Sequence, residues 1–370
     1  MQNNNQPLIS VVIPVRNCES TIYYTLKSVL NQTTQNFEVV VSDNYCDDDT
    51  AKVILSFKDE KIKYFKTDER LSMCDSYEFA ASKAIGKYMI IIGGDDGIHQ
   101  NALDRLEEEI LNTNYKMYCW PVKLYKWPNN KGIAFEDDCN MYRFNSIKQI
   151  DTVSAAIANL KLGGWRYENL MTMLYHTCIS MSIVKDVIKD HGRLFYTTQP
   201  DVYTSYVIPA YVKELKVIDK PITISGHSKH GNSAVTLDKN NKNYDKFMQE
   251  YGNYKIDESV PTGMPIREAT LLEPLYVAKK RIAIYKYTKI NEHLSWANVV
   301  CNTRYTGNIW TNWKICFMHT NLLDFLIISI YVLGIFLYKT LRNLRSKKSN
   351  LSLKEVSAKN IYDYSAISTS

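Results

Sequence analysis

Zinc-finger and disulfide patterns are missing from this 370-residue sequence. Its eight cysteines are scattered, with no C-x-x-C pair and no histidine at the spacing that completes a structural zinc site. The first residues, MQNNNQPLIS, are polar and lack the apolar core of a secretory signal peptide. These absences argue against structural zinc and against disulfides, so we expect reduced thiols and a cytoplasmic protein.

The sequence also lacks the excess of basic residues over a folded domain that nucleic-acid binding would need. The formal net charge is +6, and KTLRNLRSKK, residues 339–348, holds five basic residues and no acid. Because the rest of the chain is close to neutral, we expect no nucleic-acid partner. A short basic segment of this kind is compatible with anionic lipid head groups.

Long hydrophobic runs are scarce, and only FLIISIYVLGIFLY, residues 325–338, stands out. It is charge-free over 14 residues and reaches 17 when extended back across Asp324 to Leu322, whereas a perpendicular span needs about 20. If it crossed, the basic residues after it would lie on the cytoplasmic side and the N-terminal body outside. We therefore predict a peripheral or monotopic contact of 321–348 with the cytoplasmic face of a membrane, with a buried core helix as the alternative. Whether 322–338 spans, dips into or avoids the bilayer stays open.

The first 120 residues alternate between strand-like and helix-like patterns. Continuous apolar runs predict strands at 8–15, 37–43, 61–67, 87–93 and 115–122. Helical spacing predicts helices at 19–32, 47–58, 72–85 and 100–112. This alternation predicts an α/β fold with a mostly parallel sheet sandwiched by helices.

The pattern loosens after about residue 123. We expect a hairpin with an Asn-Asn turn, then helices at 151–160, 182–190, 200–212 and 266–290, strands within 214–226, and a polar loop at 227–260. We divide the chain into a main domain at 1–235 (a nucleotide half, 8–120, and an acceptor half, 121–235), a helical extension at 236–320, the apolar segment at 321–348, and a disordered tail at 349–370.

Polar residues follow three of the predicted strands, at the sheet edge where ligands bind in such folds. Arg16 and Asn17 follow the first strand, Asp43 and Asn44 follow the second, and Asp95 and Asp96 follow the fourth in YMIIIGGDDG. Two adjacent carboxylates at this edge are costly unless a cation is present, and Mg²⁺ or Mn²⁺ bridging a diphosphate is the simplest one. Gly93 and Gly94 would let that group approach the backbone, and Asp96 has the alternative role of a helix cap.

These stretches carry a resemblance. ISVVIPVRNCESTIYYTLKSVLNQTTQNFEVVVSDNYCDDDT and AIGKYMIIIGGDDGI resemble the opening and the metal motif of the family-two glycosyltransferases with the GT-A fold. QPDVYTSY and IDKPITISGHSKHGNSA resemble a downstream pattern in one bacterial branch of that family. The resemblance covers residues 8–120 well and 196–235 moderately.

The resemblance implies a role for each matching residue. The metal motif would place Asp95 on Mn²⁺ or Mg²⁺, with Asp96 supporting the sugar or the metal shell. Asp201, in PDVY, falls where the catalytic base of the family lies, with a helix N-cap as the alternative. The residues expected to line the nucleotide pocket are Pro14, Arg16, Asn17, Asp43, Asn44, Arg70 and Gly94. Of these, Asp43 or Asn44 would read the base edge, and Arg70 would reach phosphate or remain a solvated surface arginine.

The sequence departs from the family pattern at three places. Gly93 stands where the first acid of the metal motif is usual, Asp43-Asn44 replaces Asp-Asp, and Arg16 replaces a residue that is often aromatic. None of these changes removes the acid expected to touch the metal.

The function implied is inverting transfer of a sugar from a nucleotide-diphosphate-sugar donor to a saccharide or lipid-linked saccharide acceptor, in surface polysaccharide synthesis. Two alternatives remain. A nucleotidyltransferase would need a glycine-rich basic loop after the first strand, and PVRNCES has no glycine. A non-catalytic, membrane-tethered nucleotide or sugar binder would keep the pocket without turnover.

Overall fold

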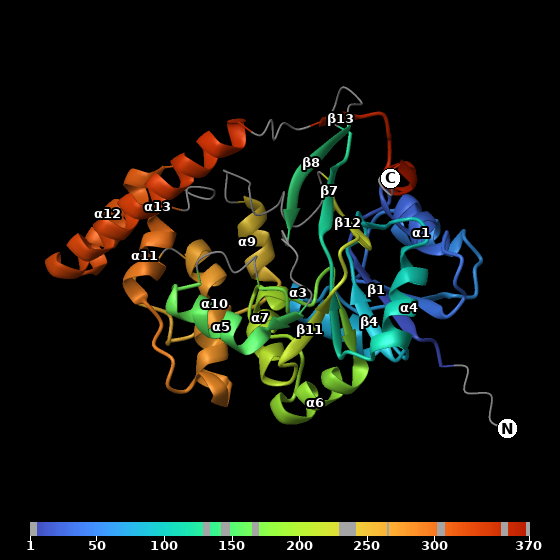
Figure 1. The fold of residues 1–370 in the computed structure, drawn as a ribbon, viewed down its shortest axis with the longest axis horizontal. Helices are drawn as coiled ribbons and strands as arrows, with labels where there is room; N and C mark the ends of the chain where they lie inside the picture. The colour runs from blue at the N-terminus through green and yellow to red at the C-terminus, as the bar shows by residue number, and fades with distance from the viewer. Residues whose placement is uncertain are drawn as a thin grey trace.

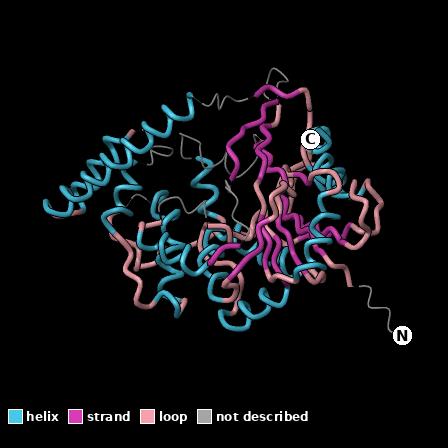
Figure 2. Tube along the Cα trace, in the orientation of Figure 1, coloured by secondary structure: helices cyan, strands magenta, loops and turns pink. Residues whose placement is uncertain are grey.

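The structure is a computed structural model and describes residues 6–128, 134–141, 149–164, 170–228, 242–264, 266–301, 308–348 and 354–367. Within these ranges, eight strands form the main sheet in the order β3-β2-β1-β4-β10-β6-β11-β9 (Figures 1 and 2). Their bounds are β1 Ile9–Val15, β2 Phe37–Asp43, β3 Ile62–Lys66, β4 Tyr88–Ile91, β6 Met117–Cys119, β9 Gln149–Asp151, β10 Cys178–Ser180 and β11 Glu214–Val217.

The central part of this sheet is parallel. Strands β3, β2, β1 and β4 are parallel to one another, whereas β10 runs antiparallel to its neighbours β4 and β6. The insertion of β10 separates β6 from β4, so the fifth predicted strand does not pair with the fourth. The prediction of a mostly parallel α/β sheet is confirmed.

Helices cover both faces of the sheet, because its strands are apolar on both sides. Val11 and Ile13 pack in one buried cluster with Leu26 of α1, while Val12 packs in a second cluster with Ala80 of α3. The first half of the chain contributes α1 Ile22–Leu30, α2 Thr50–Leu55, α3 Met73–Ser82 and α4 Ala102–Thr113; α5 Thr152–Lys161, α6 Met181–His191, α7 Pro200–Val207 and the short η2 Ile208–Ala210 follow.

A second sheet stands beside the first and connects distant parts of the chain. Its order is β13-β8-β7-β12-β5, with bounds β5 Gly97–Ile98, β7 Val122–Lys126, β8 Ala134–Met141, β12 Thr223–His227 and β13 Lys354–Val356. The predicted hairpin corresponds to β7 and β8, and its Asn-Asn turn lies outside the described residues. Strand β5 directly follows Asp95 and Asp96, so the second sheet reaches the edge of the main sheet where these two carboxylates lie.

The helical extension packs on the α7 side of the main sheet and continues its core. Leu272, Trp296 and Val332 belong to the same buried cluster as Val12 of β1. The helices are α9 Lys242–Gln249, α10 Ile266–Arg281, the short η3 Ala283–Tyr285, α11 Glu292–Cys301, α12 Ile309–His319 and α13 Leu322–Lys348, and Figure 1 shows α11, α12 and α13 farthest from the sheet. The polar stretch expected to be a loop at 227–260 contains α9.

The prediction of a disordered tail is wrong for residues 354–367. Strand β13 pairs antiparallel with β8, and α14, Ile361–Ile367, packs against α1. Ile361 and Tyr364 are buried one helical turn apart, and the Tyr364 ring stacks on Tyr125 with ring centroids 5.1 Å apart. The polar composition of this segment gives no sign of β13 and α14, whose partners lie more than two hundred residues away in the sequence.

Candidate active site

The turn that leaves β4 points one of its two carboxylates inward. Asp96 is 1% exposed. Its Oδ1 accepts a hydrogen bond from the Gly226 N–H at 2.7 Å, and its Oδ2 accepts bonds from the Gly93 N–H at 2.6 Å and the Tyr175 hydroxyl at 2.5 Å. Both oxygens are therefore engaged by the protein. The expected role of Asp96 in a metal or sugar shell does not agree with this geometry, and we assign it to holding the turn.

Asp95 is the carboxylate that faces outward. It is partly exposed, and its Oδ2 accepts a bond from the Ser228 N–H at 3.2 Å. Burial, followed by the charge of Asp96, raises the pKa of Asp95 to about 6. Such a shift means that the ionised Asp95 carboxylate is poorly solvated and lies near a second acid, so a bound cation would stabilise it.

The backbone of β12 runs directly against this turn. A Cβ atom at Gly226 would lie 1.7 Å from the carbonyl oxygen of Asp95. That same oxygen accepts a bond from Nε1 of Trp127 at 2.9 Å. Only glycine fits at this crossing, and its close approach allows the Gly226 N–H to reach Asp96.

A segment ahead of β10 supplies the other partner of Asp96. The His176 N–H donates to the carbonyl of Ile91 at 3.0 Å, which places Tyr175 beside the end of β4. Nε2 of His176 lies 3.4 Å from Oδ2 of Asp96. Burial lowers the pKa of His176 to about 3, so the ring is neutral at neutral pH and this contact is not an ion pair.

Asp201 lies in the first turn of α7, one residue after Pro200. Its Oδ1 is buried and makes no hydrogen bond. Burial raises the pKa of Asp201 above its ordinary value. The Tyr77 phenol on α3 has its pKa raised first by burial and then by the charges of Asp201, Asp96 and Asp95. The charges of all three carboxylates therefore act on one buried phenol, which places Asp95 and Asp201 in the same region of the protein.

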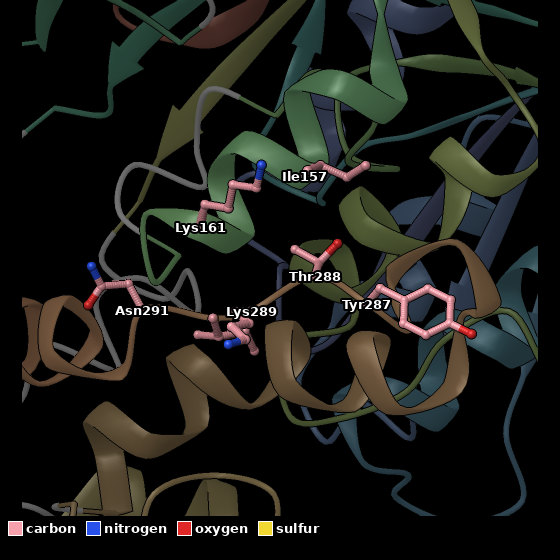
Figure 3. A pocket seen from close by; sticks show the side chains of 7 residues that line it. Ile157, Lys161, Tyr287, Thr288, Lys289 and Asn291 are labelled. Atoms are coloured by element: carbon pink, nitrogen blue, oxygen red, sulfur yellow. The ribbon is translucent and has the colours of Figure 1, made fainter.

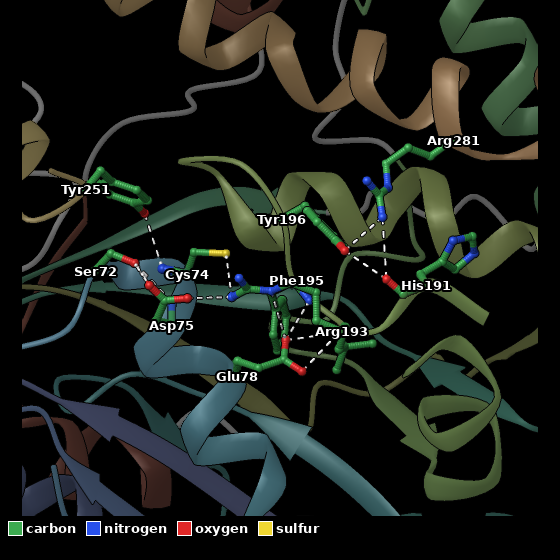
Figure 4. A network of polar contacts seen from close by, with 11 residues as sticks. Ser72, Cys74, Asp75, Glu78, His191, Arg193, Phe195, Tyr196, Tyr251 and Arg281 are labelled. Carbon is green, nitrogen blue, oxygen red and sulfur yellow. Dashed lines mark hydrogen bonds and ion pairs between the residues drawn. The ribbon is translucent and has the colours of Figure 1, made fainter. Parts of the chain in front are cut away.

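A polar network ties α3 to the segment that leads into α7 (Figure 4). Arg193 donates to Asp75 at 2.6 Å, and the two backbone N–H groups after it donate to Glu78 at 3.0 and 2.9 Å. From α10, Arg281 donates to the Tyr196 hydroxyl at 2.8 Å. These contacts fix the seven-residue approach to Pro200, and so the position of the Asp201 helix relative to Tyr77.

The rim on the predicted nucleotide side is made by the turns after β1 and β2. Asn17 has a left-handed backbone (φ 51°), and its Nδ2 donates to Asp47 at 2.5 Å. Arg70 also reaches Asp47, at 3.4 Å. Arg16 forms an ion pair with Glu250, just past α9. Arg16, Asn17 and Arg70 thus line one rim, and their guanidinium and amide groups pair with Asp47 and Glu250.

Asp43 and Asn44 are turned into the protein, contrary to the prediction that one of them reads a base edge. The Asp43 carboxylate is fully buried and accepts bonds from the Cys46 N–H at 2.7 Å and the Tyr64 hydroxyl at 2.5 Å. The Asn44 amide pairs with the backbone N–H and C=O of Leu71 at 2.8 and 2.9 Å. Both side chains therefore support, from inside the protein, the turns that form this rim.

Pro14 and Gly94 have packing roles in this structure. Pro14 lies in β1, opposite Ser42 of β2. The carbonyl of Gly94 accepts bonds from the hydroxyls of Thr21 and Thr25, at 2.9 and 3.1 Å. A Cβ at Gly94 would lie 2.9 Å from the Val15 side chain, so glycine allows the turn to pack against α1 and β1.

The donor set can be tested against Mn²⁺ or Mg²⁺. Over the described residues, no group of three or more His, Cys, Asp or Glu side chains could hold a metal ion. At the turn after β4, Asp95 offers a partly exposed carboxylate. Mg²⁺ commonly uses one or two carboxylates and takes its other ligands from water and substrate phosphates. The residues present therefore fit an ion that arrives with a diphosphate, and they do not form a closed protein cage.

Two open hollows lie away from these carboxylates. One of about 560 Å³ lies between α5 and residues 287–291 (Figure 3), and one of about 470 Å³ adjoins it and shares Lys289 and Ile290. Their lining includes Lys161 and Lys279 but none of the residues around Asp95 or Asp201. These two hollows therefore give no support to a donor site around Asp95 and Asp201.

Sequence reasoning missed Tyr77, Tyr175, His176 and the role of Gly226. Tyr77 and Tyr175 look like core tyrosines in the sequence, and the left-handed conformation of His176 (φ 59°) cannot be read from it. Gly226 stands in ITISGH, where a glycine inside a strand pattern is a usable signal of close backbone approach. Trp127 also contacts the Asp95 turn, and the sequence gives no sign of this contact.

Comparisons with known proteins point to glycosyltransferases. Residues 10–152 match the family model described as "Glycosyl transferase family 2". The chain is 34% identical over 89 residues to the Escherichia coli UDP-Glc:alpha-D-GlcNAc-diphosphoundecaprenol beta-1,3-glucosyltransferase WfaP, which is 24% of this chain and 36% of the relative. It is 30% identical over 107 residues to the E. coli enzyme WfgD of the same description, covering 29% of this chain and 42% of the relative. The matches span less than half of either relative.

A solved structure shares the architecture over most of the chain. Residues 1–349 of TarS from S. aureus, in complex with UDP-GlcNAc, align with a TM-score of 0.50 at 14% identity, covering 88% of each chain. At this identity the likeness shows the fold alone, and it confirms the GT-A-like α/β architecture. Residues 10–152 therefore carry the glycosyl transferase family 2 domain that the family model describes.

Proposed function

We propose that the chain is an inverting glycosyltransferase that moves a sugar from a nucleotide-diphosphate-sugar donor to a hydroxyl of a saccharide or lipid-linked saccharide. One observation carries the proposal beyond the family domain. Asp201 has a buried carboxylate oxygen with no partner, and its charge acts on the same buried phenol, Tyr77, as the charge of the partly exposed Asp95. A base and a diphosphate-side acid therefore face one region at the sheet edge.

In this proposal Asp201 is the general base. Its carboxylate takes the proton of the acceptor hydroxyl while the oxygen attacks the anomeric carbon. The new C–O bond forms as the bond from that carbon to the diphosphate breaks, and the nucleoside diphosphate leaves with the electron pair. Burial of Asp201 raises its pKa and so strengthens it as a base once it is ionised.

On the leaving-group side, Asp95 would hold Mn²⁺ or Mg²⁺. When bound, the ion would neutralise charge that develops on the diphosphate. Asp96 holds the turn that presents Asp95, through Gly226 and Tyr175. Arg16 lies at the rim as a second cation that could meet the donor, with Glu250 as its present partner.

The acceptor side is proposed from the relatives. WfaP and WfgD are described as acting on a sugar linked to diphosphoundecaprenol. We propose a similar saccharide or lipid-linked acceptor, a role in surface polysaccharide synthesis, and a place on the cytoplasmic face of a membrane. Among the residues that the structure describes, one helix, over Leu322–Leu341, is long and apolar enough to cross a bilayer by length and composition.

The two alternative functions predict different results in an activity assay. A nucleotidyltransferase would release diphosphate and form a nucleotide–sugar bond, and a binder would show no turnover at all. The family 2 match of residues 10–152 favours sugar transfer over both.

The test begins by screening UDP-, GDP- and dTDP-sugars for thermal stabilisation that depends on Mn²⁺, since a ligand that binds only the folded state raises the melting temperature. Turnover of the selected donor is then measured in Asp201→Asn, Asp95→Ala and the control Asp219→Asn, whose side chain is exposed. We expect Asp201→Asn and Asp95→Ala to lose turnover while remaining folded. Full turnover in Asp201→Asn would refute the assignment of the base.

A further inference from the structure

Helix α13 has two faces of different character. Ile328, Val332 and Ile335 are buried, and their spacing places them on one side of the helix. On the opposite side lies a stripe whose side chains are 52–69% exposed, and we call it the apolar stripe: Leu322, Leu326, Ile330, Leu333, Leu337 and Leu341. A contiguous exposed row of this kind marks an interaction surface.

The buried face is fixed to the body of the protein. Asp324 lies 2.8 Å from Nε2 of His293, and Asn291 donates to the Tyr331 hydroxyl at 3.2 Å. The neighbouring helix α11 is itself attached to the core, because Ser295 donates to the carbonyl of Gly163 at 3.2 Å. Helix α13 therefore presents its apolar stripe outward from a rigid support.

The distribution of charged residues along α13 suits contact with a lipid surface. Between Asp324 and Lys339 the sequence holds no charged residue, and from Lys339 to Lys348 it holds five basic residues and no acid. The exposed ring of Phe317, on α12, contacts Phe325 with centroids 5.0 Å apart and adds apolar surface next to α13. An apolar stripe that ends in basic residues matches hydrocarbon bordered by anionic head groups.

The chain after α13 decides between lying on the membrane and crossing it. Helix α13 ends at Lys348, and the chain pairs with β8 again at Lys354. The six steps of the chain from Lys348 to Lys354 reach at most about 22 Å when extended. The hydrocarbon core of a bilayer is about 30 Å thick. A spanning α13 would leave its C-terminal end on the far side, from which β13 could not return to β8.

We propose that α13 docks in the plane of an anionic membrane surface through its apolar stripe and does not cross the bilayer. This inference deepens the membrane partner of the proposed function, and it does not depend on sugar transfer. Both ends of the helix stay on the protein side, which keeps the sheet edge with Asp95 and Asp201 and the lipid-facing stripe on one body.

Vesicle flotation tests the docking surface. Full-length protein is mixed with vesicles of phosphatidylcholine and phosphatidylglycerol (3:1), and Leu333→Glu is compared with Leu55→Glu on α2. Both leucines are 59% exposed, which makes the second a matched control. Because burying one leucine side chain is worth about tenfold or more in partitioning, we expect Leu333→Glu to weaken vesicle binding by at least about tenfold. Leu55→Glu should bind like the wild type.

Equal flotation of the two variants would overturn the proposal. So would a wild-type protein that stays a dimer on gel filtration, becomes a monomer in Leu333→Glu and floats equally in both forms, because the stripe would then be covered by a second copy. Equal binding to vesicles of phosphatidylcholine alone would refute the role of anionic lipid.

Labelling tests the in-plane orientation. Asn321→Cys and Lys339→Cys place thiols near the two ends of α13, both at exposed positions and on the side of Val332, away from the apolar stripe. Protein bound to the outside of sealed vesicles is treated with a membrane-impermeant maleimide, with wild-type labelling subtracted. Labelling of both positions is expected, and protection of one of them until detergent is added would show a spanning helix. Donor stabilisation in solution is measured separately, so a failed docking test and a failed transferase test remain distinct.

Discussion

The substitution Gly226→Ala tests the crossing of β12 over the Asp95–Asp96 turn most sharply. The new methyl group would lie 1.7 Å from the carbonyl oxygen of Asp95, half of the 3.4 Å at which ordinary contact begins. The ring nitrogen of Trp127 would also lie 3.0 Å away. Neither atom is the end of a flexible side chain, so the turn must move away from β12.

The consequence for activity follows from the size of that movement. A misplacement of about 1 Å at a reacting site can cost about a hundredfold in rate, and overpacking costs about 1–3 kcal/mol of stability. We therefore expect kcat/KM for the selected donor to fall at least about a hundredfold. The free energy of unfolding, measured by urea denaturation, should fall by about 1–3 kcal/mol.

A second glycine provides the control for Gly226→Ala. A Cβ at Gly334 on α13 would meet nothing within 4 Å, and alanine is favoured over glycine inside a helix by about 1 kcal/mol. Gly334→Ala should leave turnover unchanged and the fold slightly more stable. If Gly226→Ala kept kcat/KM within about threefold of the wild type, the reasoning that a misplaced turn costs activity would be refuted.

Three further predictions concern single side chains. Because burial raises the pKa of Asp201, its ionised form destabilises the fold above its ordinary pKa; Asp201→Asn should therefore raise the melting temperature at pH 7, with the gain vanishing as the pH falls below about 3.9. Tyr175→Phe removes a 2.5 Å donor to Asp96 and should lower the free energy of unfolding by about 1.5–3 kcal/mol in denaturant melts, with kcat reduced. Ile361→Ala, at a fully buried contact with Gly97, should cost about 2–5 kcal/mol in the same melts, which would show that the C-terminal segment is part of the fold.

Each of these three predictions has an outcome that would contradict it. A melting temperature that falls in Asp201→Asn at pH 7 would contradict a strained, unpaired carboxylate. Unchanged kcat in Tyr175→Phe would show that Asp96 needs only its two backbone donors. An Ile361→Ala variant as stable as the wild type would mean that α14 contributes little to the core.

The strand–helix alternation and the position of Asp95 could be predicted from the sequence, because both depend on local patterns. Apolar runs such as Val11 to Ile13 have strand length and pack on both faces, as a covered parallel sheet requires. The carboxyl end of such a strand is where ligands bind, and Asp95 follows β4 there. Its outward direction also agrees with that rule.

The rest of the site depends on contacts between distant residues, which no local pattern encodes. Asp43 and Asn44 follow β2 as a ligand-reading pair would, but Tyr64 and Leu71 engage their side chains inside the protein. Asp96 differs from its neighbour Asp95 because Tyr175 and Gly226, 79 and 130 residues later, donate hydrogen bonds to it. The tail after α13 is polar on average, and two buried anchors give it structure.

The central claim is that Asp95 holds a divalent ion against the donor diphosphate while Asp201 acts only on the acceptor. The most direct test is calorimetric titration of UDP with and without Mn²⁺ into the wild type, Asp95→Asn and Asp201→Asn. We predict binding that requires Mn²⁺, is lost in Asp95→Asn and is kept in Asp201→Asn. Binding in Asp95→Asn that is as tight and as Mn²⁺-dependent as in the wild type would contradict the account.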